Sequence, residues 1–69
     1  MSLFSHNFTE SSSISNATYD DITHVLNITF RTGPRTYSYY GVPPAVWFEF
    51  TRASSAGRYF QQRIAPYYS

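Results

Sequence analysis

Acid–base or metal chemistry in this sequence would depend on two histidines, His6 and His24, and on the acidic pair Asp20–Asp21. The chain has no cysteine, so nucleophilic and acid–base sites have few residues to use. The spacing of Asp20, Asp21 and His24 matches no metal cage, whereas a turn followed by a strand explains it fully. His24 alternates onto the same face as Leu26, which indicates a half-buried or edge histidine within a strand. We therefore expect no enzyme, no cofactor and no metal site.

Tyrosine and arginine side chains offer binding chemistry instead. Tyr37 and Tyr39 alternate along one segment, and two interpretations of them stay open. They fill the core with their hydroxyls at its rim, an arrangement that the scarcity of leucine and valine favours, or they present rings on an open sheet face. Presented rings would stack on the bases of single-stranded nucleic acid, with arginines on the phosphates. The candidate ligand-binding residues are Tyr37, Tyr39, Arg52, Ser55, Arg58, Tyr59 and Arg63.

The charges are few and unevenly distributed along the chain. Only 13% of the 69 residues are charged, whereas 20% are aromatic. All basic residues are arginines that follow residue 30, and a net charge of +1 is too small to attract nucleic acid by itself. Five solvated surface arginines are one interpretation. For a binding site, we expect convergence at Arg52, Arg58 and Arg63, with Arg31 and Arg35 at a hairpin elsewhere.

Three strands are expected, and the third of them carries Tyr37 and Tyr39. The second of them is the clearest, because Leu26, Ile28 and Phe30 share one face while polar residues alternate onto the other. This pattern is typical of an antiparallel sheet with one wet side. The expected strands are 13–19, 22–31 and 36–40, joined by turns at 20–21 and 32–35.

Two short helices are expected after the strands. Pro43–Pro44 fit the start of the first helix, which is expected to end near Ser54. Ser55 is then placed to cap the second helix, over 56–65, and Gly57 is expected to allow close passage between the two helices. The order βββαα predicts an α+β domain, a three-stranded antiparallel meander with both helices packed on one sheet face.

The chain is expected to hold one domain. Residues 1–12 show no periodicity and are rich in serine and asparagine, which predicts a flexible tail. A single domain is expected over 13–66, followed by a short tail over 67–69. No stretch is apolar enough to span a membrane and no secretory signal is evident, so we expect a cytoplasmic protein.

Several motifs resemble those of the KTSC family, small domains named from the C-terminus of some lysyl-tRNA synthetases that also occur alone in bacteria and phages. The resemblance covers about three quarters of the chain, from Ile14 to Ile64. The turn at Gly33-Pro34-Arg35-Thr36 is one residue longer than is usual in the family, and Ala56 stands where the family often has lysine or proline. The resemblance implies the fold more strongly than the function, with RNA binding suggested by the synthetase context. The matching segments are Tyr19-Asp20, Leu26-x-Ile28-x-Phe30-Arg31-x-Gly33, Tyr37-x-Tyr39, Val42-Pro43 and Ala53-Ser54-Ser55-Ala56-Gly57-Arg58-Tyr59-Phe60.

Two functions from different classes fit these features. The first is a non-enzymatic binding module for RNA or a nucleotide-like ligand. The alternative is a phage-encoded interaction protein that inhibits or sequesters a host factor through an aromatic surface. A structural or oligomerisation unit is a third reading. High aromatic content and few charges also predict weak self-association.

Overall fold

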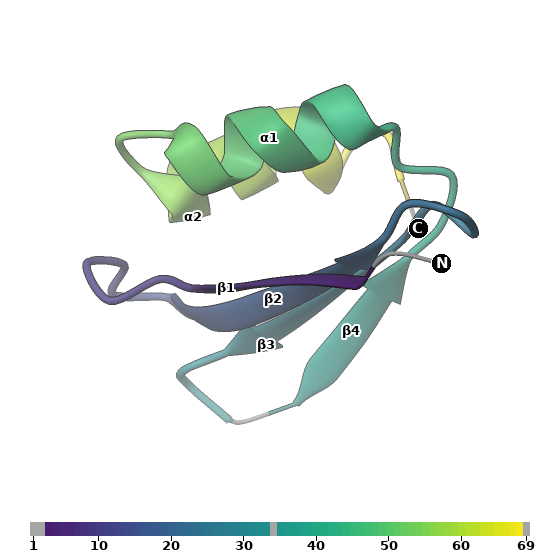
Figure 1. Ribbon diagram of the computed structural model, residues 1–69. Coiled ribbons are helices and arrows are strands. Elements are labelled where there is room, and N and C mark those ends of the chain that lie inside the picture. Colours follow the sequence, from purple (N-terminus) through teal and green to yellow (C-terminus); the bar gives the residue numbers. More distant parts are fainter. Residues whose placement is uncertain (1–2, 34, 69) are drawn as a thin grey trace.

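Four antiparallel strands form one sheet, and the helices cover one of its faces (Figure 1). The computed structural model describes residues 3–33 and 35–68, so Pro34 in the expected hairpin turn lies outside the described residues. The α+β class and the helix-covered face agree with the sequence prediction. The strands, in sheet order, are β1 (Leu3–Asn7), β2 (Ile14–Asp20), β3 (Val25–Phe30) and β4 (Thr36–Tyr39). The helices are α1 (Pro44–Arg52), α2 (Ala56–Tyr59) and the π-helical η1 (Phe60–Ile64).

The prediction of three strands is wrong, because β1 comes from the segment expected to be a tail. Leu3 pairs with Asp20 at one end of this strand and Asn7 pairs with Asn16 at the other. Phe8 follows directly and is only 6% exposed, with its ring centroid 4.8 Å from that of Phe50. The N-terminal segment is polar because one side of β1 faces solvent. Two of its apolar side chains, Phe4 and Phe8, contact α1, which comes much later in the sequence.

Arg31 fixes the loop between β1 and β2. Its Nε donates to the carbonyl of Ser11 at 2.7 Å, and its Nη2 donates to the carbonyl of Phe8 at 2.6 Å. The hydroxyl of Ser11 in turn accepts the backbone N–H of Ile14 at 3.1 Å. Hydrogen bonds from a charged donor are about twice as strong as neutral ones. Arg31 therefore has a structural role, which the sequence did not indicate.

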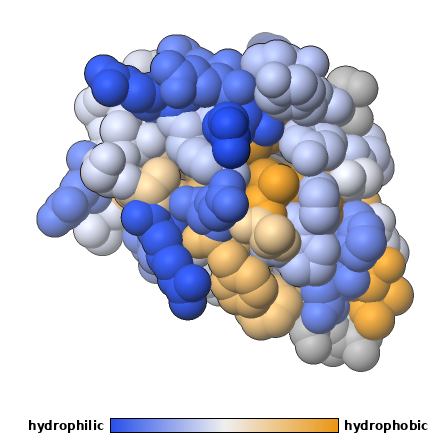
Figure 2. All heavy atoms as spheres, turned by 90° about the horizontal axis from the view of Figure 1, so that it is seen from above, coloured by the Kyte–Doolittle hydropathy of each residue, from blue (hydrophilic) through white to orange (hydrophobic). Residues whose placement is uncertain are grey.

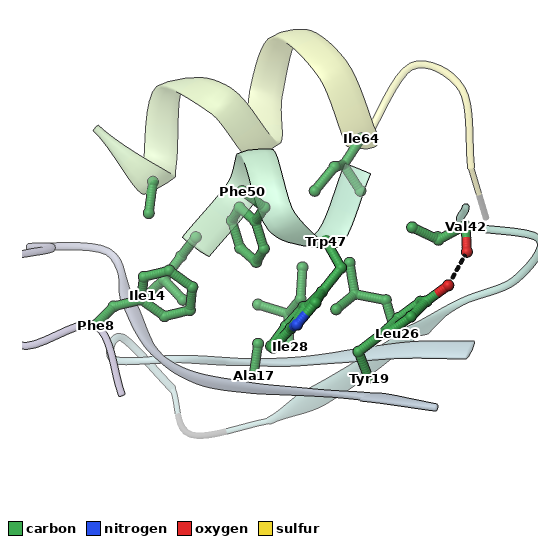
Figure 3. Close-up of a cluster of buried hydrophobic side chains, with 11 residues drawn as sticks. Phe8, Ile14, Ala17, Tyr19, Leu26, Ile28, Val42, Trp47, Phe50 and Ile64 are labelled. Atoms are coloured by element: carbon green, nitrogen blue, oxygen red, sulfur yellow. Dashed lines mark hydrogen bonds between the residues drawn. The ribbon is translucent and has the colours of Figure 1, made fainter. Parts of the chain in front are cut away.

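The core lies between the sheet and the helices (Figure 3). Tyr19 is fully buried at the end of the cluster beside Val42, stacks on Trp47 with ring centroids 5.6 Å apart, and donates its hydroxyl to the carbonyl of Val42 at 2.5 Å. Leu26 and Ile28 are also fully buried, which confirms the face predicted for this strand. The other buried apolar residues are Phe8, Ile14, Ala17, Val42, Phe50, Ala56 and Ile64.

The turn between β2 and β3 is longer than predicted, so the strand begins at Val25 rather than at Ile22. The carboxylate of Asp20 accepts the backbone N–H of Ile22 at 2.9 Å and that of Thr23 at 3.3 Å, which confirms a turn at this acidic pair. His24 is exposed and has a φ of 58° in the left-handed region. The prediction of a half-buried strand histidine is therefore wrong, because His24 lies in the turn and not in the alternating strand.

The cap predicted at Ser55 is confirmed, since its side chain accepts the backbone N–H of Arg58 at 3.3 Å. The expected second helix is α2 continued by η1, where the N–H of Ala65 donates to the carbonyl of Phe60 at 2.8 Å. A Cβ on Gly57 would lie 2.6 Å from the Ser13 hydroxyl oxygen. The close approach is therefore to the loop before β2, and the expected passage between the helices is wrong.

The last residue that the structure describes, Tyr68, packs against the core. The N–H of Tyr68 donates to the carbonyl of Ile64 at 2.9 Å, and its side chain packs partly against the buried cluster. Residue 68 of the expected tail is thus part of the packed structure, whereas Ser69 lies outside the described residues. Among the residues the structure describes, no helix has the length and apolar character needed to cross a membrane.

Candidate functional site

The two tyrosines of β4 lie on the helix-covered face of the sheet. Tyr37 pairs with Ile28 and Tyr39 pairs with Leu26, so all four side chains share this face. The Tyr37 ring meets Phe30 edge-on at 5.6 Å, and the Tyr39 ring meets Phe60 at 5.4 Å. Tyr37 is still 47% exposed because β4 is an edge strand, and burial raises the pKa of Tyr39. Tyr39 therefore packs against the core, whereas Tyr37 is exposed at the edge of the sheet with its ring against Phe30.

The open face of the sheet carries rows of hydroxyl and amide side chains. Asn27 accepts a hydrogen bond from the Ser38 hydroxyl at 2.6 Å, and the hydroxyls of Thr29 and Thr36 lie 2.9 Å apart. Neither of these two rows contains an aromatic ring on which a base could stack. One row is Ser5, Thr18, Asn27 and Ser38, and the next is Asn7, Asn16, Thr29 and Thr36.

Two adjoining hollows lie where the α1–α2 connection meets the rest of the molecule, and we call them together the Ser55 cleft. Both are lined by Ala53, Ser54 and Ser55. The first, of about 270 Å³, lies against the β1–β2 loop that Arg31 holds. Its hydroxyl-bearing residues are Thr9, Ser11, Ser12, Ser13, Thr51, Ser54 and Ser55. The second, of about 180 Å³, is also lined by Arg58, Tyr59 and Gln62.

Tyr59 is held in a fixed position in the second hollow. Its hydroxyl donates to Oε1 of Glu49 on α1 at 2.7 Å, and its ring stacks near Phe50 with centroids 6.0 Å apart. Burial, together with the hydrogen bond and charge of Glu49, raises the pKa of Tyr59 to about 12, and Arg63 acts in the opposite direction. The phenol therefore stays protonated at neutral pH and turns its hydroxyl to Glu49.

The three arginines expected to converge do not all lie together. Arg58 lines the second hollow, and Arg63 is close enough to Tyr59 to influence its pKa. The guanidinium carbon of Arg52 instead lies 5.6 Å from the ring centroid of Phe48, whose other aromatic neighbour is Phe4 on β1. Of the candidate residues, the structure brings together Ser55, Arg58 and Tyr59, with Arg63 next to them.

The sequence analysis missed the other wall of the cleft. Ser11 and Ser12 belong to the segment expected to be a flexible tail, and Ser13 to the expected start of the first strand. Their position depends on Arg31, some twenty residues away in the chain. Two serine-rich strings, at 11–13 and 54–55, were the available signal. Nothing in either string says that the other lies opposite.

Comparisons with known proteins agree on one family. A family model described as the KTSC domain matches residues 10–68. A protein of Tsukamurella paurometabola is 42% identical over 57 residues, which cover 83% of this chain and 84% of that protein. The crystal structure of a KTSC domain protein from Yersinia pestis has a TM-score of 0.87 at 32% identity, covering 99% of this chain and 93% of that one. These matches confirm the family resemblance that the sequence motifs carry.

Proposed function

The chain belongs to the KTSC family, and we propose that it is a binding module without catalysis that holds a phosphate-bearing, nucleotide-like ligand in the Ser55 cleft. The observation that carries this proposal is the position of Arg58. Its exposed side chain lines one hollow with the ring of Tyr59 and the serines at 54 and 55. A guanidinium group and hydroxyls are the side chains that recognise phosphate oxygens in proteins.

The size of the cleft suits a small ligand. Its hollows, of about 270 and 180 Å³, approach the volume of about 300–1,000 Å³ typical of ligand pockets. The first hollow offers hydroxyls to the polar part of a ligand, and the second offers Arg58 to a phosphate. The Tyr59 hydroxyl is already bonded to Glu49, so its contribution is the edge of the ring and not a hydrogen bond.

An RNA would contact the protein only over a short segment. Arg31 is bonded to backbone carbonyls and Arg52 stands over Phe48, so neither is placed beside the cleft to hold a further phosphate. Contacts to one or two phosphates support affinities on the order of micromolar. The proposed ligand is therefore a nucleotide or a short single-stranded RNA rather than a long duplex.

The test is calorimetric titration of the protein with uridine 5′-monophosphate and with a short single-stranded RNA. Arg58→Gln is expected to weaken binding about tenfold, the effect of losing one charge-assisted contact of about 1.5 kcal/mol. Because the attraction is to phosphate, binding is also expected to weaken between ~50 and ~200 mM salt.

The matched control is Arg35→Gln, which removes the same charge from the exposed β3–β4 connection. It is expected to leave binding within about twofold of the unmodified protein, since long-range attraction is screened beyond ~8–10 Å at these salt concentrations. The proposal is wrong if neither ligand binds at low salt. It is also wrong if the two variants lose affinity equally, because the cleft would then have no special role.

A further inference from the structure

The edge formed by β1 differs from the other edge of the sheet. Its sequence, Leu3 to Asn7, has no charged residue and no proline, the features by which edge strands usually avoid pairing with other chains. The opposite edge strand, β4, has four residues and follows directly on Arg35. Of the two edges, β1 is the longer and the less protected.

Alternate residues of β1 direct their backbone groups away from β2. The N–H of Phe8 donates to the carbonyl of Ser15 on the β2 side at 3.0 Å. In an antiparallel pair, hydrogen-bonded and outward-facing residues alternate. Leu3, Ser5 and Asn7 therefore turn their N–H and C=O groups outward, where another strand can pair with them.

Apolar side chains are exposed along this edge on both faces of the sheet, with Leu3 on the open face and Phe4 beside Phe48 on the helix-covered face. Leu3 is 65% exposed, and Phe4 and Phe48 are 37% and 44% exposed with their rings in edge contact at 6.4 Å. The view from the helix side shows hydrophobic residues reaching the surface in its lower half (Figure 2). Exposed apolar groups beside an unpaired strand are a usual sign of a protein interface.

Charged residues lie near the two ends of β1. Asp20 pairs with Leu3 at the start of β1, and Asp21 follows it, so this end is acidic. Contacts of Phe48 with Phe4 and of Phe50 with Phe8 show that α1 runs in the direction of β1, and the guanidinium of Arg52 turns back over Phe48. Arg31, which bonds to the β1–β2 loop, lies at the opposite end of β1.

We propose that the β1 edge binds the β1 edge of a second copy of this chain, antiparallel, about a two-fold axis at Ser5. This register pairs Leu3 with Asn7 of the other copy through the outward backbone groups, and it sets Phe4 opposite His6. It also brings the Arg31 end of one copy beside the Asp20–Asp21 end of the other. The two sheets join into one, and the net charge of +1 per copy gives little repulsion.

Ser5→Lys tests the register, because the two-fold axis would put the two lysines directly opposite each other. The control is Ser38→Lys, since Ser38 lies at the other end of the same open-face row, on β4. Sedimentation at up to ~100 µM is expected to show dimers for the unmodified protein and for Ser38→Lys, but monomers for Ser5→Lys. Circular dichroism melts of all variants show whether each is folded.

Charge reversal makes the test independent of any general damage. Ser5→Glu alone is expected to be monomeric, and an equimolar mixture with Ser5→Lys is expected to form dimers again. Concentration-dependent protection of the Leu3, Ser5 and Asn7 amides from hydrogen exchange would identify the same edge. A clean monomer of the unmodified protein at ~100 µM overturns the proposal. So does a mixture that stays monomeric, or a Ser38→Lys variant that loses the dimer as completely as Ser5→Lys.

Discussion

Consecutive residues of β3 have opposite surroundings on the two faces of the sheet. Leu26 and Ile28 are fully buried under the helices, whereas Asn27 and Thr29 form hydrogen bonds in the open on the other face. The covered face is occupied by the fold itself, and the two central rows of the open face hold no charged residue and no aromatic ring. The two surfaces proposed for binding lie at the borders of the sheet, at the Ser55 cleft and at the edge of β1.

Of the substitutions that test the difference between the two faces, Leu26→Ala is expected to lower the unfolding free energy most. Removing a fully buried leucine side chain costs about 2–5 kcal/mol of unfolding free energy, which is a large part of the stability of a small domain. Urea denaturation followed by circular dichroism measures it. The neighbouring Asn27→Ala, on the open face, is expected to cost less than about 1 kcal/mol. Equal losses for the two variants would contradict the assignment of the faces.

Tyr19→Phe tests a polar contact within the core on the covered face. The variant leaves the carbonyl of buried Val42 without the phenol donor, and we expect a loss of about 1–3 kcal/mol. Phenylalanine keeps the ring stacked on Trp47, so near-ultraviolet circular dichroism should stay close to that of the unmodified protein. A loss below about 0.5 kcal/mol would show that the hydroxyl adds little to folding.

The same variant changes the dependence of stability on pH. Burial, with the charges of Asp21 and Asp20, raises the pKa of Tyr19 above its ordinary value of 10.0. The folded chain then holds a proton that the unfolded chain loses, so the contribution of Tyr19 is present below pH 10 and is lost as the pH rises above it. Melting temperatures at pH 9 and 11 should differ less for Tyr19→Phe than for the unmodified protein.

The fold was predictable where a local pattern decides it. Alternation identified the covered side of β3, and the proline pair and Ser55 identified where the helices begin. β1 was missed because only Phe4 among its residues packs on α1 through an aromatic contact, so its sequence shows no apolar alternation. His24 was predicted in the strand because histidine gives no indication of the left-handed turn conformation that it adopts.

The candidate site was predictable on one wall and not on the other. Ser55, Arg58 and Tyr59 are close in sequence on one short helix, so their proximity follows from local structure. The facing wall depends on Arg31 bonding to the carbonyls of Phe8 and Ser11, contacts between residues far apart in the chain. Residue types alone do not indicate such tertiary contacts.

Arg31→Gln is expected to have an intermediate effect, because it weakens the loop that carries Phe8 into the covered face. Loss of hydrogen bonds from a charged donor to two carbonyls near the surface should cost about 1.5 kcal/mol. Arg35→Gln removes the same charge without these bonds and should cost no more than about 0.5 kcal/mol. Thermal melts compare the two. If Arg31→Gln is no worse than its control, the loop is held by Ser11 and the backbone alone.

Ser38→Ala is expected to have the smallest effect, and it tests whether the open face contributes to folding at all. The Ser38 hydroxyl donates to Asn27 at 2.6 Å, but in solvent water replaces this bond, so the loss should be about 0.5 kcal/mol or less. Combining it with Asn27→Ala in a double-mutant cycle isolates the pair, with an expected coupling below about 0.5 kcal/mol. A coupling above about 1 kcal/mol would mean that the hydroxyl and amide rows act as a connected network. Both faces would then stabilise the fold, and they would differ in the type of side chain that does so.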